Sequence, residues 1–168
     1  MTDTGRFAPG RVRSGFALFA CFALAFGAAR LGSVLTTPNL SWYETLDKPW
    51  FTPPNWAFPV AWTLLFAMMA ISLFMAWRVL GLRLRLHRAL LAFAVQLALN
   101  IAWSWGFFAS RDPGLGVVVI LALLVAIAWT IREFSMLSRG AALLLVPYLV
   151  WVGYAALLNT SIWWLNAP

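Results

Sequence analysis

Five long stretches of apolar residues, separated by short polar connections, dominate this sequence. They cover residues 16–37, 57–77, 89–109, 115–131 (or on to 137) and 141–165. An α-helix that rises ~1.5 Å per residue needs about 20 residues to cross the ~30 Å hydrocarbon core of a bilayer, and each stretch has roughly that length. None shows the polar–apolar alternation of barrel strands. The sequence therefore predicts an all-α integral membrane protein, a bundle of five transmembrane helices.

The composition argues against a soluble domain. Apolar residues make up 63% of the 168 residues and charged residues only 10%, whereas soluble domains carry about 25% charged residues. We expect a basic cytoplasmic tail over residues 1–14 and one membrane domain over residues 15–168. The basic start followed by an apolar run is also typical of a signal peptide, but the run continues past Arg30 to Leu35, which favours a retained span.

The basic residues are distributed unevenly among the connections. Five spans place nine of them on one side of the membrane: Arg6, Arg11, Arg13, Arg78, Arg83, Arg85, Arg88, Arg132 and Arg139. The other side has only Lys48 and Arg111. The positive-inside rule then predicts a cytoplasmic N-terminus and a C-terminus on the opposite side of the membrane. Topology explains the net charge of +7 better than nucleic-acid binding does, because the charges lie between the apolar runs.

Several functional classes lack the residues they need. The single cysteine, Cys21, forms no disulfide within the chain, and the single histidine, His87, lies in a basic connection, so no metal site is predicted. No Asp or Glu falls in the interior of a predicted span, which disfavours ion-coupled pumps and cation channels. No catalytic motif is recognisable. The chain is therefore not expected to be an enzyme.

The first connection, residues 38–55, is long and rich in proline and aromatic residues. It contains Trp42, Tyr43, Trp50 and Phe51 and is followed by Trp56. This is not a disordered composition, and long loops in compact domains are often functional. Two interpretations stay open: an ordered Pro/Trp-rich lid over the bundle mouth, or an aromatic belt that rests at the lipid headgroups.

Polar residues recur along one face of the third apolar segment. Gln96, Asn100, Trp103, Ser104 and Phe107 follow helical spacing and share that face. Unpaired amides are costly in hydrocarbon, so the face is expected to turn toward protein or a cavity. It either bonds neighbouring helices or binds a ligand.

Two other segments carry similar aromatic stripes. These are Tyr148, Trp151, Ala155 and Asn159 in the fifth segment, and Pro59, Trp62 and Phe66 in the second. Tryptophan is abundant, with 11 in the chain. An aromatic pocket with a few hydrogen-bonding groups is typical of a site for a flat apolar ligand.

The first segment contains small residues four positions apart and one arginine. Ala25 with Ala29, and Ala28 with Gly32, permit close helix contact within the bundle or in a homodimer. Arg30 has two interpretations. Its side chain either reaches the membrane interface or meets the carboxylate of a ligand at the mouth of the pocket.

Three blocks of the sequence have a specific pattern: WYETLDKPWFTPPNWAFPVAW (residues 42–62), QLALNIAWSWGFF (96–108) and PYLVWVGYAALLN (147–159). Together with Gly32, Ser33 and Thr36, they closely resemble the TspO/MBR family of tryptophan-rich sensory and translocator proteins (peripheral-type benzodiazepine receptors), in its bacterial type. The resemblance implies five helices, often a homodimer, and a cavity under the first loop. It also implies binding of porphyrins and of synthetic isoquinoline-carboxamide and benzodiazepine ligands.

The resemblance also implies a set of site residues. The ligand-binding positions that it implies are Trp62, Asn100, Trp103, Trp151, Ala155, Tyr43 and Pro53. The polar and aromatic stripes and the odd position of Arg30 add Gln96, Phe66, Tyr148, Asn159 and Arg30 as secondary candidates. No cofactor is required, and the expected ligand is protoporphyrin IX or a haem-like porphyrin. The cholesterol motif of animal members needs a Tyr and a basic residue, which residues 160–164 lack. The expected ligand is therefore a tetrapyrrole and not a sterol.

Several functions agree with this pattern. The leading hypothesis is a membrane receptor or sensor that binds porphyrin-like tetrapyrroles and modulates tetrapyrrole handling or a stress response. The alternatives are a transporter of tetrapyrroles or small lipids, a light- or oxygen-dependent porphyrin-degrading activity, and a structural scaffold whose aromatic stripes only pack.

Overall fold

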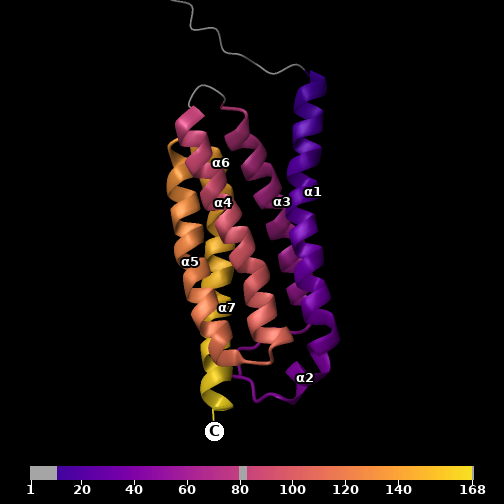
Figure 1. The fold of residues 1–168 in the computed structure, drawn as a ribbon. Coiled ribbons are helices and arrows are strands. Elements are labelled where there is room, and N and C mark those ends of the chain that lie inside the picture. The colour runs from indigo at the N-terminus through magenta and orange to yellow at the C-terminus, as the bar shows by residue number, and fades with distance from the viewer. Residues whose placement is uncertain (1–10, 80–82, 168) are drawn as a thin grey trace, which may run out of the picture.

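The computed structural model describes the backbone of residues 11–79 and 83–167, and the side chains of residues 12–79 and 87–167. All regular structure in this part of the chain is helical (Figure 1). The long helices are α1 (Arg11–Thr36), α3 (Ala57–Trp77), α4 (Arg83–Ser104), α5 (Pro113–Ser135) and α7 (Val146–Leu165). The short ones are η1 (Thr37–Asn39), α2 (Leu40–Thr45), the π-helical turn η2 (Trp105–Ala109) and α6 (Arg139–Leu144).

The predicted five-helix membrane bundle is confirmed, because five helical stretches are long and apolar enough to cross a bilayer. Helix α1 packs beside α3 and α4, α5 packs beside α4 and α7, and α6 closes the bundle against α3. We call the end that carries α2 and the end of α7 the loop end, and the opposite end the basic end (Figure 1). Most of the predicted basic tail, including Arg6, lies outside the described residues, and α1 begins at Arg11.

The turn between α4 and α5 sets their antiparallel packing. Asp112 caps α5, and its Oδ1 accepts a hydrogen bond from the backbone N–H of Leu115 at 3.0 Å. Pro113 follows in the first turn, where no N–H is needed. Arg111 adopts a left-handed backbone with φ of 53°, which is uncommon outside glycine.

The fifth apolar segment forms two consecutive helices and not one continuous helix. Helix α6 ends at Leu144, and α7 starts at Val146 with Pro147 in its first turn. Proline has no N–H for the preceding turn, and its ring clashes with that turn's carbonyl, so the helix breaks here. Ser72 Oγ donates to the carbonyl of Ala141 at 2.7 Å and ties α6 to α3.

The basic-end half of the bundle is solidly packed. Phe93 of α4 and Phe134 of α5 stack with ring centroids 6.0 Å apart and planes 8° apart. Met69, Ile127 and Leu145 are almost completely buried. Buried alanines along α1, α3 and α4 let the helices approach closely, which is how membrane helices gain packing energy.

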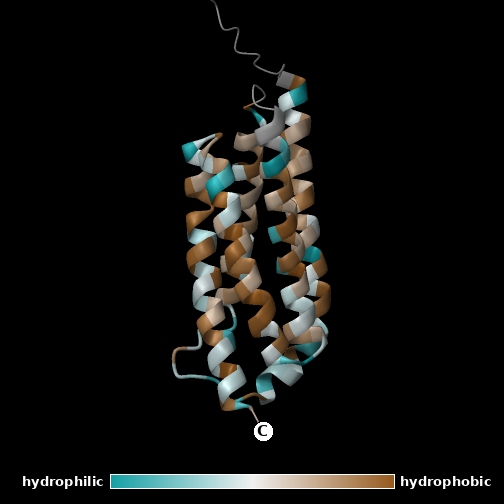
Figure 2. Ribbon diagram, turned by 60° about the vertical axis from the view of Figure 1, so that its left-hand side comes forward, coloured by the Kyte–Doolittle hydropathy of each residue, from teal (hydrophilic) through white to brown (hydrophobic). Residues whose placement is uncertain are grey.

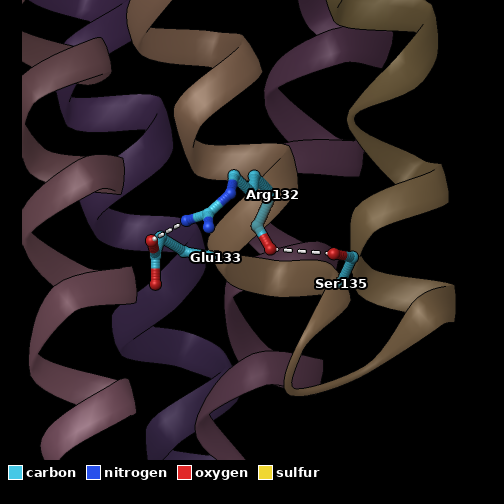
Figure 3. Close-up of polar contacts among 3 residues, drawn as sticks. All are labelled: Arg132, Glu133 and Ser135. Carbon is cyan, nitrogen blue, oxygen red and sulfur yellow. Dashed lines mark hydrogen bonds and ion pairs between the residues drawn. The ribbon is translucent and has the colours of Figure 1, made fainter.

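One buried acidic residue lies in the last turn of a membrane helix, at the basic end of the bundle. Helix α5 continues past residue 131 to Ser135, so it includes Glu133, which is 5% exposed. Its Oε1 accepts from Arg132 Nη1 at 3.2 Å, and Ser135 Oγ donates to the Arg132 carbonyl (Figure 3). The buried carboxylate therefore has a cationic partner at the basic end.

Exposed tryptophan side chains gather at the loop end. These are Trp50, Trp56, Trp105, Trp163 and Trp164. Hydrophobic residues, in brown, run along the length of each helix, and most hydrophilic residues, in teal, lie toward the two ends of the bundle (Figure 2). Tryptophan favours the membrane–water interface, so the loop end is expected to lie at the headgroups.

We predict that Gly116→Ala destabilises the bundle. A Cβ at Gly116 would lie 2.7 Å from Asn159 Oδ1 and 2.9 Å from Phe107 Cδ2, and overpacking of this kind costs about 1–3 kcal/mol. The measurement is thermal unfolding of the purified protein in detergent. Gly153→Ala is the control, because a Cβ there meets nothing within 4 Å; equal melting temperatures for the two variants would contradict the packing described here.

Candidate functional site

A cavity of about 640 Å³ occupies the loop-end half of the bundle. Its wall comes from α1, α3, α4, η2 and α7, with α2 across the loop end. The lining residues are Phe26, Ala29, Arg30, Gly32, Ser33, Thr36, Thr37, Leu40, Tyr43, Glu44, Asn55, Phe58, Pro59, Trp62, Thr63, Phe66, Asn100, Trp103, Ser104, Phe107, Phe108, Ala155, Leu158, Asn159 and Ile162. The volume lies within the ~300–1,000 Å³ range of small-molecule sites.

Aromatic rings form a continuous part of this wall. The Trp62 ring centroid lies 5.7 Å from that of Phe66 and 6.4 Å from that of Trp103. Trp103 in turn lies 5.7 Å from Phe107. Both indoles are only half-buried, so they keep surface for a ligand. Such rings favour offset or edge contact with a flat aromatic molecule.

The π-helical turn η2 adds a second aromatic residue to the wall. Phe107 and Phe108 are neighbours in sequence, yet both line the cavity, with ring centroids 4.8 Å apart. A π-turn inserts an extra residue into the helix and changes the facing of the residues around it, often at functional sites. The sequence pattern predicted Phe107 on this face and missed Phe108, because regular helical spacing gives no sign of the turn.

A hydrogen-bond chain joins three helices beside the cavity. Trp103 Nε1 donates to Asn159 Oδ1 at 3.0 Å, and Asn159 Nδ2 donates to the Pro113 carbonyl at 2.8 Å. Asn159 is 2% exposed, so its amide is satisfied by α4 and α5. This arrangement supports the interpretation of helix-to-helix bonding for Asn159, although the residue also touches the cavity.

A second polar pair lies deeper in the bundle. Asn100 Nδ2 donates to Tyr148 Oη at 3.0 Å, and Asn100 lines the cavity. Tyr148 is fully buried and lies behind the wall, as does Gln96, whose Nε2 faces Met69 Sδ at 3.9 Å. Tyr148 therefore supports Asn100, and Gln96 packs in the core. Neither of these two secondary candidates lines the cavity.

Two of the predicted ligand-binding residues also lie off the cavity wall. The Trp151 ring meets the lining residue Phe58 edge-on, with centroids 6.2 Å apart. Its indole N–H is buried and has no partner among the described residues. Pro53 lies half-buried in the loop, where Asn55 lines the cavity instead. Helical spacing gave the correct face of α7 but not how far along that face the cavity extends.

Hydrogen bonds anchor the first loop to the end of α7. Asn166 Oδ1 accepts from the Asp47 N–H at 3.0 Å, and its Nδ2 donates to the Asp47 carbonyl at 2.9 Å. Tyr154 Oη donates to the Phe51 carbonyl at 2.7 Å. These bonds make the loop an ordered cover, as the lid interpretation expects. Another part of the same loop, the exposed Trp50, agrees with the second interpretation, an aromatic belt at the lipid headgroups.

The loop also supplies a roof residue, Tyr43. It is 8% exposed and packs against the rings of Phe107 and Phe108. Lys48 Nζ lies over its ring, 4.9 Å from the centroid. Among the described residues, no group hydrogen-bonds to the buried Tyr43 hydroxyl. The roof therefore presents an unpaired polar group beside the cavity.

Sequence reasoning missed most of the contribution of α1. One stripe of this helix, Phe26, Ala29, Gly32, Ser33 and Thr36, lines the cavity together with Arg30. The spacing of the small residues predicts helix contacts, and Gly32 does allow close packing, since a Cβ there would lie 3.2 Å from Ser104 Oγ. The hydroxyls of Ser33 and Thr36 beside Gly32 were the available signal for a cavity wall.

The fold and the site together define a five-span membrane protein with an aromatic cavity under an ordered extramembrane loop. Residues 18–165 match the TspO/MBR family. The chain is a member of this family.

Relatives of similar length support the assignment. The chain is 41% identical over 150 residues to a tryptophan-rich protein TspO of Chlorobaculum tepidum, covering 87% of this chain and 93% of the relative. It is 37% identical over 151 residues to a tryptophan-rich sensory protein of Cereibacter sphaeroides, covering 90% and 92%. Identity to the human translocator protein is 35% over 126 residues, covering 74% and 75%. The similarity therefore extends over most of the bundle in bacteria and in animals.

We predict that Asn166→Ala loosens the loop without unfolding the bundle. Each lost hydrogen bond is worth about 0.5–1.5 kcal/mol net, so amide exchange at Asp47 is expected to speed up about two- to tenfold. Hydrogen–deuterium exchange measured by mass spectrometry checks this. Asn39→Ala is the matched control, because Asn39 hydrogen-bonds to Leu35 and Arg111 and not to Asp47. Unchanged exchange at Asp47 in Asn166→Ala would show that the loop is held by packing alone.

Proposed function

We propose that this protein is a membrane receptor that binds porphyrin-like tetrapyrroles in its loop-end cavity. The ligand-bound receptor then modulates tetrapyrrole handling or a stress response. The single observation that carries the proposal is the aromatic cavity of about 640 Å³. Its volume and its mix of rings with a few polar groups suit a flat, largely apolar ligand.

Named side chains supply the contacts that such a ligand needs. The macrocycle stacks on Trp62 and Trp103, which are adjacent on the wall. Asn100 and the unpaired Tyr43 hydroxyl offer hydrogen bonds at two separate places. Trp151 acts indirectly by packing on Phe58. The loop closes over the ligand and excludes water from the site.

Family membership supports a sensing role. One relative is named a tryptophan-rich sensory protein and several are named translocator proteins, so sensing and translocation are the functions to separate. We favour sensing because the only acidic residue among the described lining residues, Glu44, lies on the short helix α2 at the loop end, whereas coupling of transport to protons or cations uses acidic groups deep inside the spans. A receptor needs no resident cofactor, and the porphyrin enters as ligand.

The proposed receptor lies in the bacterial cell membrane with its basic end in the cytoplasm. Arg78, Arg88, Arg132 and Arg139 belong to the basic end, whereas the loop end has Lys48 and Arg111 among its described residues. Positive residues stay on the cytoplasmic side during insertion. The cavity and its loop then face the opposite side of the membrane.

The decisive experiment places a larger side chain in the cavity, at a position of α7 that lines it, and measures porphyrin binding. Ala155 is buried on the wall, so Ala155→Phe is expected to weaken protoporphyrin IX binding at least tenfold (about 1.4 kcal/mol). The measurement is a titration of the detergent-solubilised protein in the dark, followed by tryptophan fluorescence quenching. Leu157→Phe adds the same ring to the exposed face of the same helix and should bind like the wild type.

Equal quenching in the wild type and both variants would contradict the proposal, because porphyrin would then only partition into the micelle. A steady loss of the porphyrin absorbance in the dark would point to degradation instead. Movement of porphyrin across liposomes that contain the protein would point to transport.

The orientation is tested separately by cysteine labelling of intact cells. Ser110→Cys lies in the exposed α4–α5 turn at the loop end, and Met136→Cys is exposed at the basic end. A membrane-impermeant maleimide is expected to label Ser110→Cys and to spare Met136→Cys until the cells are lysed. The native Cys21 is buried, so the wild type provides the background. Labelling of Met136→Cys and not of Ser110→Cys in intact cells would show that the orientation is the opposite of the one proposed.

A further inference from the structure

We propose that Arg30 is an anion-recognition residue at a lipid-facing mouth of the cavity, and that it selects amphiphilic ligands that carry a carboxylate. The inference rests on the proposed function for the existence of a cavity ligand, and it adds the chemical class and the residue that discriminates. It starts from the position of Arg30, a charged residue of α1 that lines the cavity and is also exposed.

The exposed lining residues show where the cavity opens. On α1 they are Phe26, Arg30, Ser33 and, in η1, Thr37; on α3 they are Pro59 and Thr63. Three further exposed lining residues, Leu40, Glu44 and Asn55, belong to α2 and the loop at the loop end. The sets on α1 and α3 each follow helical spacing, so the two stripes face each other across adjacent helices. The cavity therefore opens sideways between α1 and α3, toward the surface that lipid covers in a membrane.

The depth of Arg30 places its charge in an unfavourable environment. Counted from Ser14, which follows the basic start of α1, the ~30 Å hydrocarbon core takes about 20 residues and ends near Val34. Arg30 then lies about 6 Å inside that boundary at ~1.5 Å per residue. An arginine in a span is costly and by default indicates a functional site.

Reaching the headgroups is difficult for this side chain. Helical side chains lean toward the N-terminus of their helix, which for α1 is the basic end and not the nearer loop end. Within the part of the chain that the structure describes, the Arg30 guanidinium makes no hydrogen bond or ion pair. Its donors are therefore free at the mouth.

The surroundings of the mouth favour an anion with hydrogen-bond acceptors. Ser33 and Thr37 continue the polar stripe from Arg30 toward the loop end, with their hydroxyl oxygens 3.4 Å apart. The inner wall is aromatic, and Glu44 is the only acid among the described lining residues. A ligand with an apolar body and one acidic edge would thus place the body inside and the carboxylate at Arg30, away from Glu44.

Arginine suits this role chemically. Its planar guanidinium binds a carboxylate through two parallel hydrogen bonds, and the attraction is strong where water is scarce. An ester of the same acid keeps the apolar body and loses the charge. The pair of acid and ester therefore isolates the contribution of Arg30 from the contribution of the aromatic wall.

The test compares protoporphyrin IX with its dimethyl ester by fluorescence titration of the full chain in phosphatidylcholine nanodiscs. The wild type is expected to bind the diacid at least fivefold more tightly than the diester. Arg30→Gln should bind both equally, with the affinity for the diester unchanged, and Arg30→Lys should keep part of the preference. Arg13→Gln removes an exposed charge at the basic end of the same helix and should behave like the wild type.

The outcomes separate this inference from the proposed function. An undiminished preference for the diacid in Arg30→Gln overturns it and assigns the guanidinium to lipid headgroups. Saturable diester binding that Ala155→Phe blocks, without any preference for the diacid in the wild type, also overturns it while the proposed function stands. Absence of saturable binding of either porphyrin defeats the proposed function itself. Circular dichroism melting of Arg30→Gln at the wild-type temperature shows that a lost preference is not a folding defect.

Discussion

The amide of Asn159 connects the helices around the hollow half of this bundle. It accepts from the Trp103 indole and donates to the Pro113 carbonyl, so α4, α5 and α7 meet at one side chain. Lipid offers no hydrogen-bond partner, so a buried amide must find its partners within the protein. Its hydrogen bonds depend on direction, whereas apolar packing between membrane helices does not fix one orientation. Gly116 makes the meeting possible, because its missing Cβ leaves room for Asn159 and Phe107. The orientation of Trp103, and with it the aromatic wall, depends on this junction.

The two halves of the bundle differ in how their interior is filled. At the basic end, Phe93, Phe134 and Met69 fill the interior, and the buried Glu133 is paired with Arg132. At the loop end the same helices diverge around a cavity, and the loop is bonded over it through Asn166 and Tyr154. A solid half holds the spans in place, so the other half stays open without collapsing. This division lets a chain with few polar residues present a preformed site inside a membrane.

The sequence predicted the elements that depend on local physics. Length and hydropathy gave five spans, and the span of residues 57–77 agrees with α3 at both ends. Helical spacing placed Asn100, Trp103 and Ala155 on inward faces. The turn at Asp112 and Pro113, which makes α4 and α5 antiparallel neighbours, is equally local, because the cap and the proline lie within the first turn of α5. Each of these features follows from residues close together in the chain, where periodicity and capping act directly.

Other features follow only from how distant segments meet. The break before Pro147 changes the direction that side chains of the fifth segment face. The π-turn that begins at Trp105 contains Phe107 and Phe108, which both line the cavity. Trp151 and Pro53 fall behind the wall because the extent of the cavity is set by neighbouring helices and not by their own stripes. The hydroxyl stripe of α1 becomes a mouth only because α3 lies opposite it. Sequence alone thus determined the spans, their inward faces and the family pattern. The tertiary structure decided which inward residues border empty space, because a cavity is what several helices together leave unfilled.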